Sequence, residues 1–185
     1  MKELFEEYPY LEDEIIILRK MTLNDVSFLK AMTQEKEAYR FLPTFLYELK
    51  YDEKDQVIRK MDEECFFNKE SILLGIYRKE DPDELVGIAE IYSYKPEKKK
   101  ASIGYRLRKE YWGRGIATRA AALLKDYILD DRGMSTVTGH VMKENIASAK
   151  VLTKNGLINK YPDNWEDWGF DDLVLVDKYV LKRYD

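Results

Sequence analysis

Cysteine, long apolar runs and clustered basic residues are all scarce in this sequence of 185 residues. The one cysteine, Cys65, cannot form a disulfide within the chain, and nothing else points to an oxidising compartment. No apolar run approaches the roughly 20 residues that a membrane-spanning helix needs. The acidic start of the chain, residues 1–7, lacks the hydrophobic region of a signal peptide. We therefore expect a cytoplasmic protein with no membrane partner.

The charge pattern excludes a further class of partner. The net charge is -4, and no broad basic stretch is interleaved with aromatic residues, so we expect no nucleic acid partner. A mildly acidic protein is compatible with a cationic substrate. Because 45% of the residues are apolar and no repeat, linker or low-complexity segment occurs, residues 1–185 are predicted to form a single globular domain. We predict no metal site.

What the sequence does contain is a glycine-rich turn, Trp112-Gly113-Arg114-Gly115-Ile116-Ala117. The apolar pattern predicts a strand directly before it, over 101–107, and a helix directly after it, over 117–128. A turn that opens a helix exposes unpaired backbone N–H groups and the positive end of the helix dipole, which suits a phosphate. The turn has neither the G-x-x-x-x-G-K-[ST] run of nucleoside triphosphatases nor the last glycine of the G-x-G-x-x-G dinucleotide fingerprint. On its own it is equally consistent with an ordinary strand-to-helix turn.

The turn and the strand before it resemble the acetyl-CoA signature of the GNAT superfamily of N-acetyltransferases. That signature, [Q/R]-x-x-G-x-[G/A], leads into a helix; here Gly115 and Ala117 fill the two small positions, and Trp112 replaces the first Gln or Arg. Segments 104–107 and 111–118 are similar in particular to the ribosomal-protein alanine N-acetyltransferases and their relatives. The chain departs from that branch at Arg119-Ala120, where a Glu-Ala pair is common.

A second block, Glu144 to Gly156, resembles the N-x-x-S...K-x-G helix of the same family. In relatives the Asn contacts the pantetheine arm of the cofactor and the Ser lies close to the thioester sulfur. From the residues alone, Asn145 is a good helix N-cap, Ser148 follows on roughly the same face, and Gly156 is a good helix end. A capped helix with no ligand explains these residues too, but it does not explain why both blocks occur in this order.

The resemblance implies a mixed α+β fold of the α/β class. It would be a GNAT-like three-layer sandwich whose central twisted mixed sheet has about six to seven strands, with helices on both faces. The hydrophobic pattern predicts strands over 14–20, 72–78, 85–94, 101–107, 136–141, 156–160 and 173–181. It predicts helices from Thr22 past Met32, over 52–67, over 117–128 and from Asn145 to Gly156.

The resemblance also assigns a binding site for acetyl-CoA (coenzyme A). The parallel strands 101–107 and 136–141 should splay apart, the pantetheine arm should fill the opening, and the diphosphate should lie on the amides of the turn. A backbone N–H near Leu107 would meet the thioester carbonyl, and Arg119 would offer further positive charge. The residues assigned to the cofactor are Leu107, Lys109, Trp112, Gly113, Arg114, Gly115, Ile116, Ala117, Thr118, Asn145 and Ser148.

Two residues are candidates for catalysis. Glu90 occupies a place where many relatives have an acid, and it could act as a base directly or through a water; a structural carboxylate is the alternative. Ser148 is the candidate acid for the departing thiolate. We expect His140 and Tyr105 to be structural, and Cys65 to be a buried small hydrophobe with no nucleophilic role.

The resemblance implies direct transfer of an acetyl group to a primary amine in a ternary complex. The preferred acceptor is a protein or peptide N-terminal α-amine, and the protein would be a monomer or homodimer. The alternatives are a small amine such as a polyamine or an antibiotic, and a non-catalytic acyl-CoA-binding sensor of the same fold. The segment from Tyr161 to Asp172 mixes aromatic and acidic residues. It would either hold a cationic amine or, as we prefer, form a hairpin whose rings cap the core.

Overall fold

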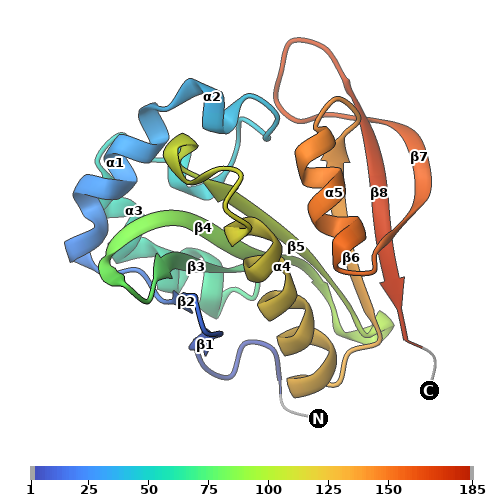
Figure 1. Cartoon of the computed structure of the whole chain (residues 1–185), viewed down its shortest axis with the longest axis horizontal. Coiled ribbons are helices and arrows are strands. Elements are labelled where there is room, and N and C mark those ends of the chain that lie inside the picture. The colour runs from blue at the N-terminus through green and yellow to red at the C-terminus, as the bar shows by residue number, and fades with distance from the viewer. Residues whose placement is uncertain (1–2, 184–185) are drawn as a thin grey trace.

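The computed structural model describes residues 3–183. Its frame is one mixed sheet of eight strands in the order β1-β2-β3-β4-β5-β6-β8-β7 (Figure 1). The strands are β1 (Leu11–Glu12), β2 (Ile16–Arg19), β3 (Ser71–Arg78), β4 (Asp81–Lys95), β5 (Lys100–Leu107), β6 (Thr136–Met142), β7 (Ile158–Glu166) and β8 (Val174–Lys182). The α-helices are α1 (Val26–Gln34), α2 (Lys36–Tyr39), α3 (Lys54–Met61), α4 (Ile116–Asp126) and α5 (Ile146–Lys154). Short π-helical segments, Asp62–Phe67 and Tyr127–Asp131, continue α3 and α4.

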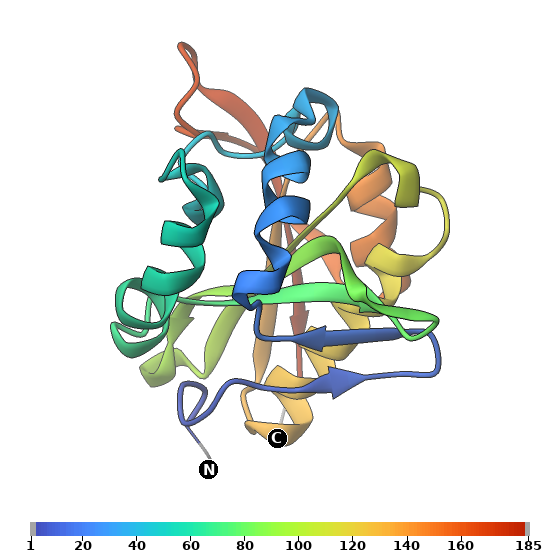
Figure 2. The ribbon, with the colours of Figure 1, turned by 90° about the vertical axis from the view of Figure 1, so that its left-hand side faces the viewer.

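The helices cover both faces of the sheet, as predicted. Side chains alternate along a strand, so Ile72 and Leu74 of β3 join the core beneath α4 and α5, whereas Leu73 joins the core beneath α1 and α3. Figure 2 shows α1 and α3 standing together on one side of the sheet. Leu124 of α4 and Met61 of α3 are fully buried in these two cores.

The strand predictions are confirmed for seven strands and incomplete at two places. The two-residue strand β1 is too short to produce a periodic pattern, so the sequence did not indicate it. Strand β7 continues to Glu166, beyond the predicted 156–160, and pairs antiparallel with β8, so the segment from Tyr161 to Asp172 belongs to a hairpin, as preferred. Its pairing with β8 shifts register at Asn159/Tyr161 and again at Tyr161/Asn164, and these irregularities interrupt the alternation that would have marked it.

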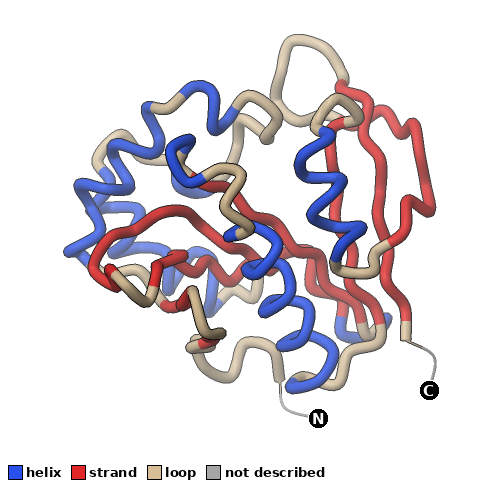
Figure 3. The backbone as a smooth tube through the Cα atoms, in the orientation of Figure 1, coloured by secondary structure: helices blue, strands red, loops and turns tan. Residues whose placement is uncertain are grey.

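Strands β5 and β6 are parallel neighbours for only part of their length. Their pairing runs from Lys100–Thr136 through Ala101–Val137 to Ser102–Thr138, and no later pair forms between the two described strands. Figure 3 shows the two strands running apart from this paired end. The splay that the sequence predicted is therefore confirmed.

The core beneath α4 gives a stability prediction. Replacing the fully buried Leu124 by Ala should lower the free energy of unfolding by about 2–5 kcal/mol, because a cavity remains among well-packed neighbours. The neighbouring Leu123 is only half-buried, and Leu123→Ala serves as the matched control. Urea denaturation measures both, and equal losses in the two variants would contradict this assignment of the core.

Candidate active site

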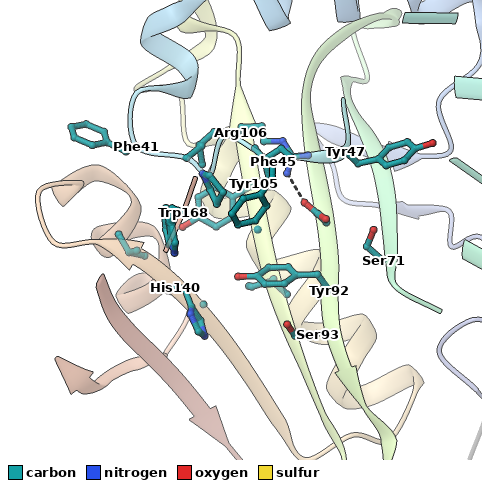
Figure 4. A pocket seen from close by; sticks show the side chains of 18 of the residues that line it. Phe41, Phe45, Tyr47, Ser71, Tyr92, Ser93, Tyr105, Arg106, His140 and Trp168 are labelled. Carbon is teal, nitrogen blue, oxygen red and sulfur yellow. Dashed lines mark hydrogen bonds and ion pairs between the residues drawn. The ribbon is translucent and has the colours of Figure 1, made fainter. Parts of the chain in front are cut away.

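A cavity of about 900 Å³ lies where β5 and β6 separate. Side chains from both faces of the sheet line it: Glu90, Tyr92 and Arg106 come from β4 and β5, whereas Asn145 and Ser148 come from the start of α5. The segment 41–50 and residues 166–168 close it from the side of α1 and α3 (Figure 4). The cavity therefore passes through the sheet, and a molecule could reach its centre from either face.

A buried charge network forms one wall of this cavity. The Arg106 guanidinium donates from Nε and Nη2 to the two carboxylate oxygens of Glu48, each at 2.5 Å, and from Nη1 to Glu90 Oε2 at 2.7 Å. The side chains of Arg106 and Glu48 are 3% and 0% exposed, and that of Glu90 is 13% exposed. Of the two carboxylates, Glu90 is thus the one that faces the cavity.

Burial sets the protonation behaviour of this network. It raises the pKa of Glu90 above its usual value; the Arg106 guanidinium opposes this shift and the Glu48 carboxylate adds to it. Burial alone would lower the pKa of Arg106, but the two carboxylates outweigh it and raise that pKa. Arg106 therefore remains charged, and Glu90 is a more basic carboxylate than one in water.

Glu48 and Arg106 belong to the charge network of this cavity wall, and the sequence reasoning did not single them out. Arg106 stood out only as one of the polar residues that alternate along β5, and Glu48 lies in an irregular segment around a short 3-10 turn, Tyr47–Leu49. A charged residue within a strand was the one available signal, because a charge that becomes buried requires a partner. The partner itself could not be located, since Glu48 and Arg106 are 58 residues apart.

On the opposite face of the sheet, Tyr105 joins β5 to α5. Its hydroxyl lies 2.9 Å from Ser148 Oγ and donates to the Ser148 carbonyl at 3.0 Å. Asn145 caps α5 as predicted, because its Oδ1 accepts from the Ser148 amide at 3.1 Å. Tyr105 packs against the core, as expected, but it also lines the cavity, and burial raises the pKa of its hydroxyl. Tyr105 and Ser148 together place two hydroxyls on this face.

The glycine-rich turn leaves open space in front of its backbone. Gly113 and Gly115 have φ of +73° and +78°, in the left-handed region that favours glycine. A Cβ added at either position would meet no atom within 4 Å, and α4 begins directly afterwards at Ile116. Ile116 is buried in the core, so only its amide can serve a ligand. The turn thus has the free amides and the room that a diphosphate requires.

The main chain of β5 also faces the opening. Because the Arg108 amide donates to the Val86 carbonyl of β4, the preceding Leu107 presents its amide and carbonyl on the other side of β5, toward β6. The Trp112 indole donates to the Leu107 carbonyl at 3.0 Å. Trp112 therefore folds back over the start of the turn.

Two residues that we expected near the cofactor, Lys109 and Arg119, already bind other groups of the protein. The Lys109 amide donates to Glu35 Oε2 at 2.8 Å, and the Lys109 carbonyl accepts from the Trp112 amide at 3.1 Å. The Arg119 guanidinium is paired with Asp13 at 2.8 Å and Glu14 at 2.6 Å, so much of its charge is offset. Arg114 keeps its guanidinium near the turn, 5.4 Å from the centre of the Tyr111 ring. Thr118 lies deeper in α4, where its carbonyl accepts from Asn155.

The aromatic and acidic tail forms the far wall of the cavity. Trp168 is buried, and its indole donates to Glu166 Oε2 at 2.8 Å, while His140 Nδ1 lies 3.1 Å from Glu166 Oε1. Trp165 and Phe170 are exposed, so the preferred interpretation, in which the rings of this segment cap the core, is wrong for these two. His140 lines the cavity rather than facing a layer of helices.

The segment from Tyr161 to Asp172 is held against segment 41–50, which forms another wall of the cavity. The Trp168 carbonyl accepts from the Thr44 amide at 2.8 Å and lies 3.3 Å from the Thr44 hydroxyl. Figure 2 shows these two segments, which are far apart in the sequence, meeting at one end of the molecule. At Gly169, a Cβ would lie 2.0 Å from Thr44 Oγ1, so this close approach depends on glycine.

Other candidate chemistry is not supported by the described residues. Cys65 is buried as predicted, and burial raises the pKa of its thiol to about 12, so almost no thiolate forms near neutral pH. Among residues 3–183, no three His, Cys, Asp or Glu side chains gather into a possible metal site. No helix within the same range is long and apolar enough to span a bilayer.

Comparison with known proteins agrees with this geometry. The family model for the acetyltransferase (GNAT) domain matches residues 16–158. An uncharacterised N-acetyltransferase from Bacillus licheniformis, p20, is 28% identical over 158 residues, which cover 82% of this chain and 86% of that protein.

Two solved structures share the fold at low sequence identity. The ribosomal L7/L12 alpha-N-protein acetyltransferase RimL, in complex with coenzyme A, superimposes with a TM-score of 0.75 at 16% identity, covering 94% of this chain and 98% of that one. The spermidine N-acetyltransferase from Vibrio cholerae, in complex with CoA and spermine, also has a TM-score of 0.75, at 13% identity, covering 92% and 96%. The predicted three-layer fold is thereby confirmed.

The charge network makes a prediction about stability and pH. Arg106→Met should lower the free energy of unfolding by about 3–5 kcal/mol at pH 7.5, because it leaves Glu48 and Glu90 buried without a cation. Without Arg106 the folded-state pKa of Glu90, which burial already raises, lies still farther above its unfolded value, so stability is lost as pH rises and the deficit should be smaller at pH 5. Urea denaturation at both pH values measures this.

The control is Arg183→Met, which removes a cation from an exposed pair with Asp130 and should change stability by less than about 0.5 kcal/mol at either pH. A deficit for Arg106→Met that is equal at pH 5 and pH 7.5 would contradict the proposed cause.

Proposed function

Because the chain belongs to the GNAT family of acetyltransferases and uses acetyl-CoA as its acetyl donor, we propose that its acceptor is the α-amine at a peptide or protein N-terminus. What supports this acceptor is the candidate base that the cavity offers, the Glu90 carboxylate held by Arg106. About a tenth of α-amino groups are free base at pH 7, against about one lysine side chain in a few thousand. A weakly basic carboxylate is therefore sufficient to deprotonate an α-amino group but is poorly matched to a lysine side chain.

The residues around the splay fit acetyl-CoA. In this proposal the amides from Gly113 to Thr118 hold the diphosphate, with the Arg114 guanidinium nearby, and Asn145 and the Leu107 main chain border the pantetheine arm. The bound thioester supplies an activated acetyl group. The Leu107 amide, which points toward β6, stabilises negative charge on the acetyl oxygen. Lys109 can join these contacts only if Glu35 releases its amide.

In this proposal the two proton transfers take place on opposite faces of the cavity. On the face of α1 and α3, Glu90 receives a proton from the acceptor ammonium. On the face of α5, Ser148 provides a hydroxyl for the departing sulfur, and Tyr105 lies within hydrogen-bond distance of that hydroxyl. The amine and the thioester thus approach from opposite faces, which suits direct attack without a covalent enzyme intermediate.

A second candidate acceptor is a small polyamine or another small amine. The carboxylates of Glu70, Glu166 and Asp167 also line the cavity, and with the Trp168 ring they could attract additional positive charge. One of the structural neighbours is named for spermidine. The two acceptors differ in how many cationic groups they bring to the cavity.

An acceptor panel tests the proposal. Purified protein with acetyl-CoA is given peptides with a free α-amine, a peptide with a blocked α-amine and a free lysine, and spermidine, and release of free thiol is followed. We expect kcat/KM to be at least about 10-fold higher for a peptide with a free α-amine, given the amine pKa difference. Spermidine as the best acceptor would favour the second candidate instead.

The role of Glu90 makes a pH prediction. Glu90→Gln should lower kcat/KM by about 10²-fold, because general base catalysis contributes roughly that much or more. In the unaltered protein, activity should fall as pH drops through the raised pKa of Glu90, since the protonated carboxyl cannot accept a proton. Glu97→Gln, which changes an exposed carboxylate just beyond the same strand, should keep the original profile. An unchanged profile in Glu90→Gln would exclude Glu90 as the base.

The glycine turn makes a prediction about binding. Gly115→Ala and Gly156→Ala both place a Cβ at a φ near +80° with open space around it, so each should cost about 1–2 kcal/mol of stability. Only Gly115 borders the proposed diphosphate site, so only Gly115→Ala should weaken coenzyme A binding, by about 10-fold or more on the scale of one lost strong contact. Calorimetric titration with coenzyme A measures both, and equal affinities would contradict the site.

A further inference from the structure

The cavity holds a second possible proton acceptor, on the wall opposite Glu90. His140 of β6 lines the cavity, and its Nδ1 lies 3.1 Å and 3.4 Å from the two oxygens of Glu166. The Trp168 indole, which can only donate, occupies Glu166 Oε2 at 2.8 Å. Two groups from the tail therefore fix the position of the His140 ring.

The hydrogen bond to Glu166 determines which ring nitrogen is free. A carboxylate accepts hydrogen bonds, so the neutral imidazole must carry its hydrogen on Nδ1 and keep its lone pair on Nε2. Within the described part of the chain, His140 Nε2 has no hydrogen-bond partner. This is the arrangement in which a carboxylate orients a histidine to accept a proton.

Strand register places His140 at the same level as Glu90. Ser102 and Thr138 are the last paired residues of β5 and β6, and their hydroxyls lie 2.7 Å apart, so they share a face. Two residues farther along, Gly104 and His140 occupy the next positions on that face. Glu90 of β4 is the partner of Gly104 and lies on that face as well. Glu90 and His140 thus lie on one face of the sheet, on either side of Gly104, and the Tyr92 ring packs over Gly104 within the same cavity lining.

The proton balance of the reaction requires two acceptors. An ammonium that becomes an amide loses two protons, as its nitrogen forms a bond to the acetyl carbon and the carbon–sulfur bond breaks with its electron pair on sulfur. The sulfur takes one proton in the released thiol, and the other proton goes to solvent. A single carboxylate on the acceptor side holds one proton at a time, so Glu90 would have to release the first proton before it could take the second.

We propose that His140, oriented by Glu166, is a catalytic residue that accepts the second proton of the acceptor nitrogen at Nε2. Glu90 takes the first proton, before attack, and His140 takes the second as the carbon–nitrogen bond forms and the nitrogen becomes acidic. Protonated His140 then lies beside the Glu166 carboxylate, which stabilises the cation until its proton passes to solvent. Glu90 also releases its proton to solvent, and Ser148, which gives one proton to the sulfur, recovers one from solvent, so that one net proton is released. The inference rests on the proposed role of Glu90, but it holds for any primary amine acceptor.

The groups around His140 keep its imidazole ring neutral near pH 7. Burial lowers its pKa below the usual value near 6.5. The Glu166 carboxylate of β7 opposes this shift, and Lys178 of β8 and Lys100 of β5 add to it. At neutral pH the ring is therefore a free base, which is the state that an acceptor of protons requires.

Because His140 is the only histidine in the chain, its state can be measured without any activity. The protein is labelled with nitrogen-15 histidine and its two ring nitrogens are assigned by long-range NMR correlation at pH 7.5. We expect the neutral ring with hydrogen on Nδ1 and a titration midpoint below 6.5. Hydrogen on Nε2, or a midpoint above 6.5, would overturn the proposal.

Variants at Glu166 test the coupling. Glu166→Gln should lower the midpoint of His140 further, because it removes the group that favours the charged ring. Asp163→Asn alters an exposed carboxylate on the same strand, paired with Lys143, and should leave the midpoint unchanged. A midpoint that is the same in Glu166→Gln and in the unaltered protein would contradict the orienting role of Glu166.

Kinetics with the best acceptor of the panel completes the test. His140→Gln should lower kcat by about 10²-fold, leave coenzyme A affinity unchanged, and reduce the acidic slope of log kcat/KM against pH from two to one. A loss of kcat with an unchanged slope would indicate a structural role and overturn the proposal. If spermidine is the best acceptor, the proposed α-amine substrate fails, yet the same assay on spermidine still decides the role of His140.

Discussion

The separation of β5 from β6 is the constraint on which the rest of this structure depends. A sheet is stable because each strand satisfies the main-chain groups of its neighbours, and here that satisfaction stops after three residue pairs. The Leu107 carbonyl accepts from the Trp112 indole, whereas the Leu107 amide points into the opening, and the thiol-bearing arm of the cofactor is an extended chain with acceptors of its own. The same separation connects the two faces of the sheet. In the proposed mechanism, this connection allows the cofactor on one side to meet the amine on the other.

Burial of charge is the second theme of the acceptor side. Two walls of the cavity each contain a carboxylate held by hydrogen-bond donors: Arg106 holds Glu90, and His140 together with the nearby Trp168 holds Glu166. Fixed donors orient each carboxylate and prevent it from turning to solvent. Their environments shift the proton affinities of Glu90 and His140 toward each other, since burial raises one pKa and lowers the other.

How much of this could be predicted from the sequence depends on how local each feature is. The glycine turn, the cap at Asn145 and the seven longer strands are encoded within short windows, and they were predicted. The pairing of Glu48 with Arg106 and of Glu166 with His140 joins residues 58 and 26 positions apart, and no local pattern reports such contacts. The place of His140 in the cavity could not be predicted for a related reason: a local pattern indicates a strand, but it does not show that the adjacent strand diverges from it.

The contact between Thr44 and Trp168 links two segments that are 124 positions apart in the chain. Each contributes one side of the acceptor cavity, and the approach is so close that residue 169 must lack a side chain. A change in either segment therefore alters the fit of the other. An engineer who wishes to redirect the enzyme to a new amine would have to exchange both loops as a matched pair, since a single graft would separate the walls that recognise the substrate.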